Sequence, residues 1–144
     1  MNKISARERS LLEAAFHAMN NAYVLWGFKV GAAVLAEDGR IYEGCNVESW
    51  VSGLGICAER NAIHHAILHG NRKIKEIAIV MNVNNTGKVR PCGACVQYIY
   101  DFAENSKVKV IMAKAEKSRI DFESVEIKTV GELLPFPYKG KNDL

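Results

Sequence analysis

Apolar residues near the start of the chain recur at the spacing of a helix. The positions that share this interval of three or four residues are Leu11, Leu12, Ala15, Phe16, Met19 and Tyr23. An apolar stripe of this kind predicts an amphipathic helix with one buried face. Ser5 is followed three residues later by Glu8, the sequence of a capping box, so we expect the helix to begin there.

Two runs typical of strands follow this helix. Residues 28–35 are mostly apolar and predict a buried strand, and residues 41–47 predict a strand that returns beside it. Residues 37–40 lie between them and contain an Asp-Gly pair, which is a strong signal for a β-hairpin. The two strands are therefore expected to be antiparallel neighbours.

The rest of the chain alternates between strand and helix patterns. Helices are predicted over 57–69, ending at Gly70, and over 92–102, beginning after Pro91. Strands are predicted at 74–83, 108–112 and 120–127, with a loop at 84–87. A capping box at 129–132 predicts a short last helix, which ends before Pro135. Alternating strands and helices predict a layered α/β domain. Its sheet should be mixed, because a tight hairpin is antiparallel whereas later crossovers are parallel.

Composition narrows the class of protein. The chain has 144 residues without a linker or repeat, so we expect one domain over 1–144. Its net charge of +3 and scattered basic residues argue against a nucleic-acid partner. No stretch has the apolar length of a membrane span or the apolar core of a signal peptide. These features predict a cytoplasmic protein, in which its four cysteines stay reduced and favour metal or redox chemistry.

Two cysteine motifs carry the candidate chemistry, Cys57-Ala58-Glu59 and Pro91-Cys92-Gly93-Ala94-Cys95. Cys92 and Cys95 lie one helical turn apart, and Cys57 starts the other predicted helix, where the backbone N–H groups favour a thiolate. Three thiolate ligands leave a tetrahedral zinc ion with one open position, which is typical of catalytic sites. Glu59 is placed beside such a metal, where it could shuttle protons. This pattern is the one found in zinc-dependent nucleobase deaminases.

Other interpretations of these residues stay open. A Cys-x-x-Cys pair is also found in redox sites, and Cys45 could be a fourth ligand that closes a structural zinc site. Against the closed site, Cys45 ends a predicted strand, where a cysteine often behaves as a small apolar residue. His64, His65 and His69 lie well down their predicted helix from Cys57 and are interpreted as surface or packing residues, as is His17 on the first predicted helix.

With these motifs the sequence resembles the cytidine deaminase family, in its small homotetrameric zinc-dependent type. The segments that carry the resemblance are 28–33, 44–48, 57–60, 91–95 and 132–135. The resemblance implies a three-layer α/β/α domain with a mixed five-stranded sheet. It also implies hydrolysis of cytidine or deoxycytidine to uridine or deoxyuridine plus ammonia, as in pyrimidine salvage. The implied partners are a nucleoside substrate and further copies of the chain, with neither nucleic acid nor membrane.

The resemblance also implies a role for each site residue. Zinc would be bound by Cys57, Cys92 and Cys95, with Glu59 as the catalytic proton shuttle. The other implied roles are contact with the pyrimidine by Phe28, a grip on the ribose hydroxyl by Asn46 and Glu48, contact with the base by the Ala58 backbone, hydrogen bonds to the thiolates from Arg60, and an aromatic contact with a neighbouring subunit by Tyr138. Asn46 and Glu48 also project to one side of an extended chain, although an Asx turn is an alternative for Asn46.

The chain departs from the family pattern around the substrate. Val24-Leu25-Trp26-Gly27 replaces a Pro-Tyr-Ser element, and Ser49-Trp50-Val51-Ser52 replaces a different loop after Glu48. Two other functions therefore remain as alternatives. One is a deaminase of another aminopyrimidine nucleoside, such as blasticidin S. The other is a non-enzymatic binding domain stabilised by zinc, which predicts a need for Cys45 and none for Glu59.

Overall fold

A computed structural model describes residues 3–83 and 88–139 of the chain. Its centre is a five-stranded sheet in the order β2-β1-β3-β4-β5. The strands are β1 (Val30–Ala36), β2 (Ile41–Cys45), β3 (Ile74–Asn82), β4 (Lys109–Glu116) and β5 (Arg119–Thr129). Only β3 and β4 pair in parallel, and the other three pairs are antiparallel. The predicted mixed sheet is therefore confirmed.

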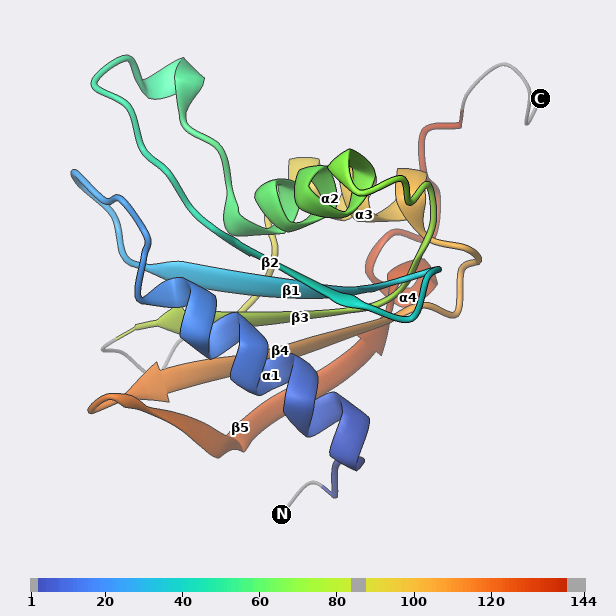
Figure 1. The fold of residues 1–144 in the computed structure, drawn as a ribbon, viewed down its shortest axis with the longest axis horizontal. Helices are drawn as coiled ribbons and strands as arrows, with labels where there is room; N and C mark the ends of the chain where they lie inside the picture. The colour runs from blue at the N-terminus through green and yellow to red at the C-terminus, as the bar shows by residue number, and fades with distance from the viewer. Residues whose placement is uncertain (1–2, 84–87, 140–144) are drawn as a thin grey trace.

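Helices cover both faces of this sheet (Figure 1). They are α1 (Ala6–Met19), α2 (Ala58–Leu68), α3 (Gly93–Phe102) and the short α4 (Val130–Leu133). The apolar side chains of α1 pack on one face with alternate residues of β1, β3 and β4, and those of α2 and α3 pack on the other face. All seven residues of β1 are buried, as expected for a strand between two helical layers. The arrangement is the three-layer α/β/α domain that the sequence implied.

Two glycines let the helices approach the sheet closely. A Cβ at Gly31 would lie 1.8 Å from the Ala15 carbonyl oxygen of α1, and one at Gly44 would lie 2.2 Å from the Ala62 nitrogen of α2. Any side chain at either position would push a helix outward, since these distances are far below van der Waals contact. Gly44 therefore sets how closely α2 packs on β2, and with it the height of Cys57 above the sheet.

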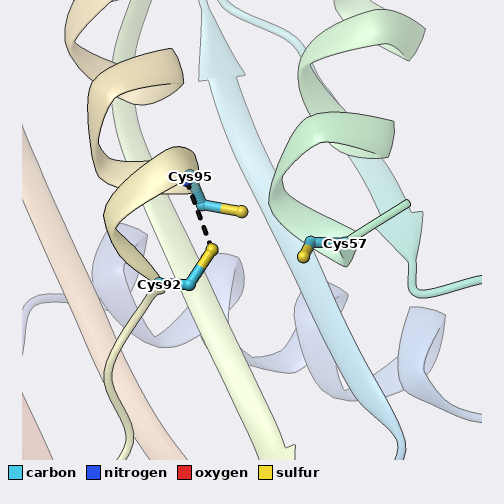
Figure 2. Close-up of side chains that lie close together, drawn as sticks. All are labelled: Cys57, Cys92 and Cys95. Atoms are coloured by element: carbon cyan, nitrogen blue, oxygen red, sulfur yellow. Dashed lines mark hydrogen bonds between the residues drawn. The ribbon is translucent and has the colours of Figure 1, made fainter. Parts of the chain in front are cut away.

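The sheet topology also brings two helix N-termini together. Because β1 is antiparallel to both β2 and β3, these two strands point in the same direction. Helix α2 follows β2 and helix α3 follows β3, so both helices begin at the same edge of the sheet, and their first turns face each other (Figure 2).

The first helix and two strands end differently from their predicted bounds. The apolar pattern extends to Tyr23, but α1 ends at Met19, and Tyr23 instead forms a bridge with Val47. The strand predicted from residue 28 begins at Val30, and the one predicted to residue 47 ends at Cys45. Backbone pairing with a neighbouring segment, which the apolar pattern does not report, sets these ends.

The last two strands and one loop also differ from prediction. The strands predicted at 108–112 and 120–127 are each longer and form a hairpin, with Lys117 and Ser118 at positive φ in its turn. A 3₁₀ helix at Ser52–Leu54 was not predicted. The loop predicted at 84–87 lies outside the described residues. Among the helices of the described residues, none has the length and apolarity to cross a bilayer.

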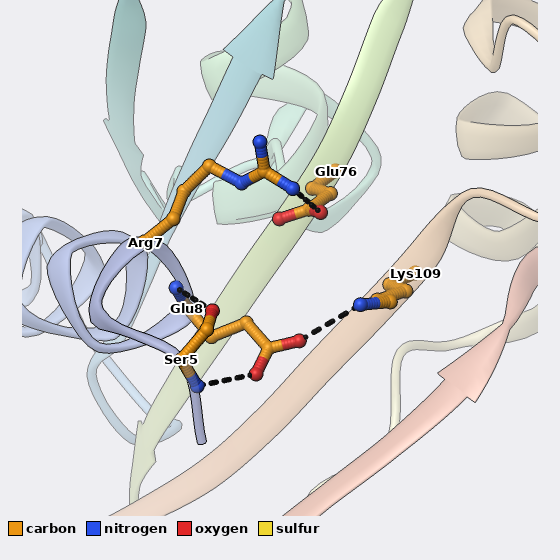
Figure 3. A network of polar contacts seen from close by, with 5 residues as sticks. All are labelled: Ser5, Arg7, Glu8, Glu76 and Lys109. Atoms are coloured by element: carbon orange, nitrogen blue, oxygen red, sulfur yellow. Dashed lines mark hydrogen bonds and ion pairs between the residues drawn. The ribbon is translucent and has the colours of Figure 1, made fainter.

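A network of charged side chains joins the start of α1 to the sheet (Figure 3). Glu8 closes the predicted capping box with Ser5, and its other carboxylate oxygen accepts a hydrogen bond from Lys109 Nζ at 3.0 Å. Its hydrogen bond to the Ser5 backbone lowers the pKa of the Glu8 carboxyl. Arg7 Nη2 lies 3.1 Å from Glu76 Oε2, whereas the buried Glu76 Oε1 has no hydrogen-bond partner among the described residues.

Replacing Arg7 by alanine should destabilise the fold by about 1–2 kcal/mol. Glu76 is 5% exposed, so loss of Arg7 removes the counter-charge of a buried carboxylate, and the part-exposed position of Arg7 moderates the loss. Urea unfolding followed by circular dichroism measures the change. Glu13→Ala is the matched control, since it breaks an exposed pair with Arg9 and should cost no more than about 0.5 kcal/mol. Equal effects of both variants would contradict a role for the buried charge.

Candidate metal and substrate site

Three cysteine side chains converge where α2 and α3 begin (Figure 2). Cys57 is the N-cap of α2, Cys92 is the N-cap of α3, and Cys95 lies one turn further along α3. Their sulfur atoms all lie within 4.8 Å of one another. The structure thus brings together the three residues that the motifs predicted, from two segments far apart in the sequence.

The cysteine cluster fits a tetrahedral zinc ion. Zn–S bonds of about 2.3 Å place the sulfur atoms of such a site roughly 3.8 Å apart, and the observed upper limit of 4.8 Å is compatible with that spacing. In the described part of the chain, this is the one group of three or more potential metal ligands. Cys45 is not a member, and burial raises the pKa of its thiol. A tetrahedral ion held by these three sulfur atoms would have a fourth position for another ligand, which is what the catalytic interpretation requires.

Hydrogen-bond donors surround the sulfur atoms, as thiolates require. The Cys95 backbone N–H donates to Cys92 Sγ at 3.4 Å, and Arg60 Nη2 donates to Cys57 Sγ at 3.6 Å. A hydrogen bond from the Cys95 thiol, together with Arg60, lowers the pKa of Cys57 to about 5. The pKa of the Cys95 thiol is raised, because it donates to Cys57 and is buried. Contact with Cys57 also raises the pKa of Arg60, so this guanidinium stays charged beside the thiolates.

In metal-free protein, Cys57 should react with iodoacetamide at pH 6 about tenfold faster than Cys45. At this pH Cys57, with its pKa of about 5, is mostly thiolate, while Cys45 is almost entirely thiol; the lower nucleophilicity of an acidic thiolate removes part of the advantage. Mass spectrometry of the labelled peptides gives both rates, and added zinc should protect Cys57 alone of the two. Equal rates would contradict the proposed activation of Cys57.

Glu59 lies in the first turn of α2 and is 3% exposed. Burial raises the pKa of its carboxyl, and the negative charge of Cys57 raises it further. A carboxyl whose pKa is raised holds a proton more readily than an ordinary glutamate, which suits a group that must accept a proton and return it. Its side chain interacts with Cys57 and Cys95, so the expected proton shuttle does lie beside the cysteine cluster.

Asn46 and Glu48 lie at the entrance to the loop that leads to Cys57. Val47, between them, pairs with Ile56, the residue two before Ala58. The Asn46 amide accepts from Val30 N at 2.9 Å and donates to the Phe28 carbonyl at 3.0 Å. Phe28 itself is half exposed and precedes β1. Asn46 therefore fixes the backbone that carries Phe28.

Glu48 holds the segment just before Phe28. Its Oε1 accepts hydrogen bonds from the backbone N–H groups of Leu25 and Trp26, and its Oε2 accepts from Gly27 N at 3.2 Å. These hydrogen bonds lower the pKa of the Glu48 carboxyl, and the bond from the Trp26 backbone has the largest effect. Sequence reasoning missed this contact. The glycine at position 27 is the related signal in the sequence, but its meaning depends on Glu48 lying opposite it in the fold.

The other residues singled out in the sequence are Ala58, Tyr138 and the four histidines. Ala58 is fully buried at the first position of α2. The Tyr138 backbone is fixed by Gln97, which donates to its carbonyl and accepts from its N–H, while its side chain stays 80% exposed. The histidines make surface contacts, with partners Glu43, Tyr98 and the carbonyl of His65. None of them joins the cysteine cluster, which confirms their interpretation as surface residues.

The fold and the cluster define a class, that of α/β proteins with a zinc site between paired helix N-termini. Comparison with known proteins gives the family. The sequence model of the cytidine and deoxycytidylate deaminase zinc-binding region matches residues 5–113. A cytidine deaminase of Sporosarcina psychrophila is 39% identical over 93% of this chain and 92% of its own, and one of Halalkalibacterium halodurans is 36% identical over 92% and 96%.

The solved structures agree with this match. The crystal structure of cytidine deaminase from Burkholderia pseudomallei superposes with a TM-score of 0.79 at 33% identity, covering 94% of this chain and 100% of that one. Cytidine deaminase from Mycobacterium tuberculosis gives a TM-score of 0.73 at 28% identity, covering 94% of this chain and 100% of that one. The chain belongs to the cytidine and deoxycytidylate deaminase family.

Proposed function

We propose that the chain is a zinc-dependent enzyme that hydrolyses cytidine and deoxycytidine to uridine and deoxyuridine, releasing ammonia. The observation that carries the proposal is the buried Glu59 carboxyl beside three clustered cysteines that leave a metal position open. The relatives of 39% and 36% identity over nearly the whole chain are cytidine deaminases.

Each group in the site has a chemical task. The three cysteines would hold zinc, which would supply Lewis-acid activation of water at neutral pH. Glu59 takes a proton from the attacking water and gives it to the ring nitrogen next to the carbon under attack. It then carries the second water proton to the departing amino group, so that water is consumed and ammonia is released. Its buried position keeps these protons from bulk water. Arg60 and the helix N-termini offset the charge of the thiolates.

The sugar grip follows from the hydrogen-bonding capacity left over at Asn46 and Glu48. Glu48 Oε1 is used by two backbone donors, while Oε2 accepts one bond and retains one acceptor position. The Asn46 amide nitrogen donates one bond and retains one N–H. One acceptor and one donor are what a single hydroxyl group needs. We infer that this pair takes one sugar hydroxyl, with Phe28 against the pyrimidine and the Ala58 backbone at the base.

A second candidate substrate is an aminopyrimidine nucleoside other than cytidine. Blasticidin-S deaminase of Bacillus cereus is 28% identical over 94% of each chain. Asn46-Val47-Glu48 and Arg60 match the cytidine deaminase pattern and favour cytidine as the substrate. The loop at 49–52 differs from that pattern and is the reason for keeping the second candidate. The zinc-stabilised, non-enzymatic domain is disfavoured, because Cys45 lies outside the cluster and Glu59 is buried beside it.

The assembly and cellular setting are proposals too. We propose that the chain is a single domain that forms a cytoplasmic homotetramer acting in pyrimidine salvage, with Tyr138 contacting a neighbouring subunit. Phe136 and Tyr138 are 93% and 80% exposed, which is unusual for aromatic side chains and supports a covering partner. Light scattering at micromolar concentration should give the mass of a tetramer, and a monomer would contradict this proposal.

The ultraviolet spectrum of cytidine tests the reaction directly. Purified zinc-loaded protein should convert the cytidine spectrum to that of uridine, with one ammonia released for each cytidine lost. Deoxycytidine and blasticidin S are assayed in parallel. The rate of deamination of deoxycytidine should be near or below that of cytidine, and the rate with blasticidin S should be far below it. A zinc-loaded protein that converts only blasticidin S would support the second candidate. One that converts neither cytidine nor deoxycytidine would contradict the proposed function.

A further inference from the structure

Two loops beside the substrate site carry an unusual amount of exposed apolar surface. Large apolar side chains that are 44–76% exposed lie on residues 23–28 or 47–54: Tyr23, Trp26, Phe28, Val47, Trp50, Val51 and Leu54. The rings of Trp26 and Trp50 make an edge-to-face contact, with centroids 5.6 Å apart and planes at 88°. This contact joins the two loops.

One carboxylate organises the first of these loops. Glu48 accepts backbone hydrogen bonds from three consecutive residues, Leu25 to Gly27, and so fixes the segment that presents Trp26. Space for the carboxylate depends on Gly27, where an added Cβ would lie 2.7 Å from Glu48 Oε2. Asn46 fixes the next residues through Phe28 and Val30. The side chains proposed to grip the sugar therefore also position the aromatic residues.

We propose that Glu48 is a positioning residue, which holds the 25–27 segment and, through the contact between their rings, Trp26 and Trp50 as one aromatic wall beside the proposed sugar contact. This inference rests on the proposed function, and it gives Glu48 a role that does not depend on contact with a sugar hydroxyl. The wall sets how tightly a pyrimidine nucleoside binds, while Glu59 and the cysteines set how fast it reacts. Substrate affinity, rather than turnover, therefore changes when the contact between Glu48 and the 25–27 segment is broken.

Gly27→Ala breaks this contact without altering a side chain that touches substrate. The new methyl group must displace the Glu48 carboxylate, which ends a flexible side chain, so the fold itself should survive. Gly53→Ala is the matched control: it makes the same change in the neighbouring loop, where a Cβ would meet nothing within 4 Å. Glu48→Gln attacks the contact from the other side, since its amide would place a donor against the backbone N–H groups.

The first measurement needs no substrate. Trp26 and Trp50 are the only tryptophans in the sequence, so the tryptophan bands of the near-ultraviolet circular dichroism spectrum report on this one pair. Gly27→Ala and Glu48→Gln should weaken these bands, and Gly53→Ala should leave them as in the wild type. Unchanged bands in Gly27→Ala would overturn the positioning role, whether or not the protein proves to be a cytidine deaminase.

The second measurement separates positioning from a direct sugar contact. KM and kcat are measured with cytidine and with 2′,3′-dideoxycytidine, which lacks both ring hydroxyls of the sugar. We expect Gly27→Ala and Glu48→Gln to raise KM about tenfold for 2′,3′-dideoxycytidine and at least as much for cytidine, which also loses the proposed hydroxyl contact, with kcat within about threefold of wild type. A rise confined to cytidine would show that Glu48 acts only on a hydroxyl and would overturn the proposal. If the wild type deaminates no cytosine nucleoside, the proposed function fails, and the spectra alone decide the role of Glu48.

Discussion

Replacing Glu59 by glutamine should lower kcat for cytidine by about 10²–10⁴-fold while the protein keeps its zinc. Glutamine preserves the volume of a side chain that is only 3% exposed, so the packing around it should not change. It cannot accept a proton from water or return one to the leaving group. The loss of the cytidine absorbance spectrum, followed with time, gives kcat, and atomic absorption gives the zinc content.

The matched control for this experiment is Glu104→Gln, which makes the same substitution at an exposed position. It should leave both kcat and zinc content as in the wild type. Activity within a few-fold of wild type in Glu59→Gln would contradict the proton shuttle. If Glu59→Gln loses zinc as well as activity, Glu59 supports the metal site. Loss of zinc, rather than loss of proton transfer, would then explain the lost activity, against the prediction.

Cys95→Ser should abolish both zinc binding and activity, whereas Cys45→Ser should abolish neither. Cys95 is fully buried within the cluster, and serine nearly matches its size, so the variant removes a ligand with little change in packing. Loss of a direct ligand should weaken zinc binding by more than the roughly 10–100-fold that loss of a ligand's hydrogen-bond partner costs. Zinc per chain after dialysis, measured beside the midpoint of thermal unfolding, tests both variants.

The two cysteine variants also separate the catalytic site from a closed structural one. A structural site with Cys45 as fourth ligand requires that Cys45→Ser lose zinc and that Glu59→Gln behave as the wild type. The catalytic site requires the reverse. Zinc loss in both cysteine variants would contradict the three-ligand cluster and return the closed site to consideration.

The sequence predicts the metal site better than the substrate site, for a physical reason. Cys57 and Cys92 each lie at the start of a helix whose pattern is strong, so local sequence places both at N-termini, and the structure confirms them as N-caps. The contact between Glu48 and Gly27 joins segments with no regular structure, and the contact between Trp26 and Trp50 does the same. Such contacts depend on the path of two loops in space, which no periodicity encodes.

The bounds of the elements show the same division. The capping boxes at Ser5 and Thr129 were predicted from a local rule and are both present. The end of α1 was not, because the apolar spacing continues to Tyr23 while the backbone turns away to pair with Val47. Local hydrogen bonds can be predicted from the sequence, whereas pairing between distant segments is seen only in the folded sheet.

The meeting of α2 and α3 at one edge of the sheet has a consequence for folding. All four cysteines are free, so no covalent bond links these helices, and the strand β3 lies between them in the sequence. A metal ion bound by Cys57 and the Cys92–Cys95 pair would tie the two helix starts together in the folded chain, and it would stabilise that state by about 2.7 kcal/mol when free zinc is at 100 times its Kd. The ion would then act as a removable cross-link, and supply of zinc would govern how long the chain survives as well as how fast it works.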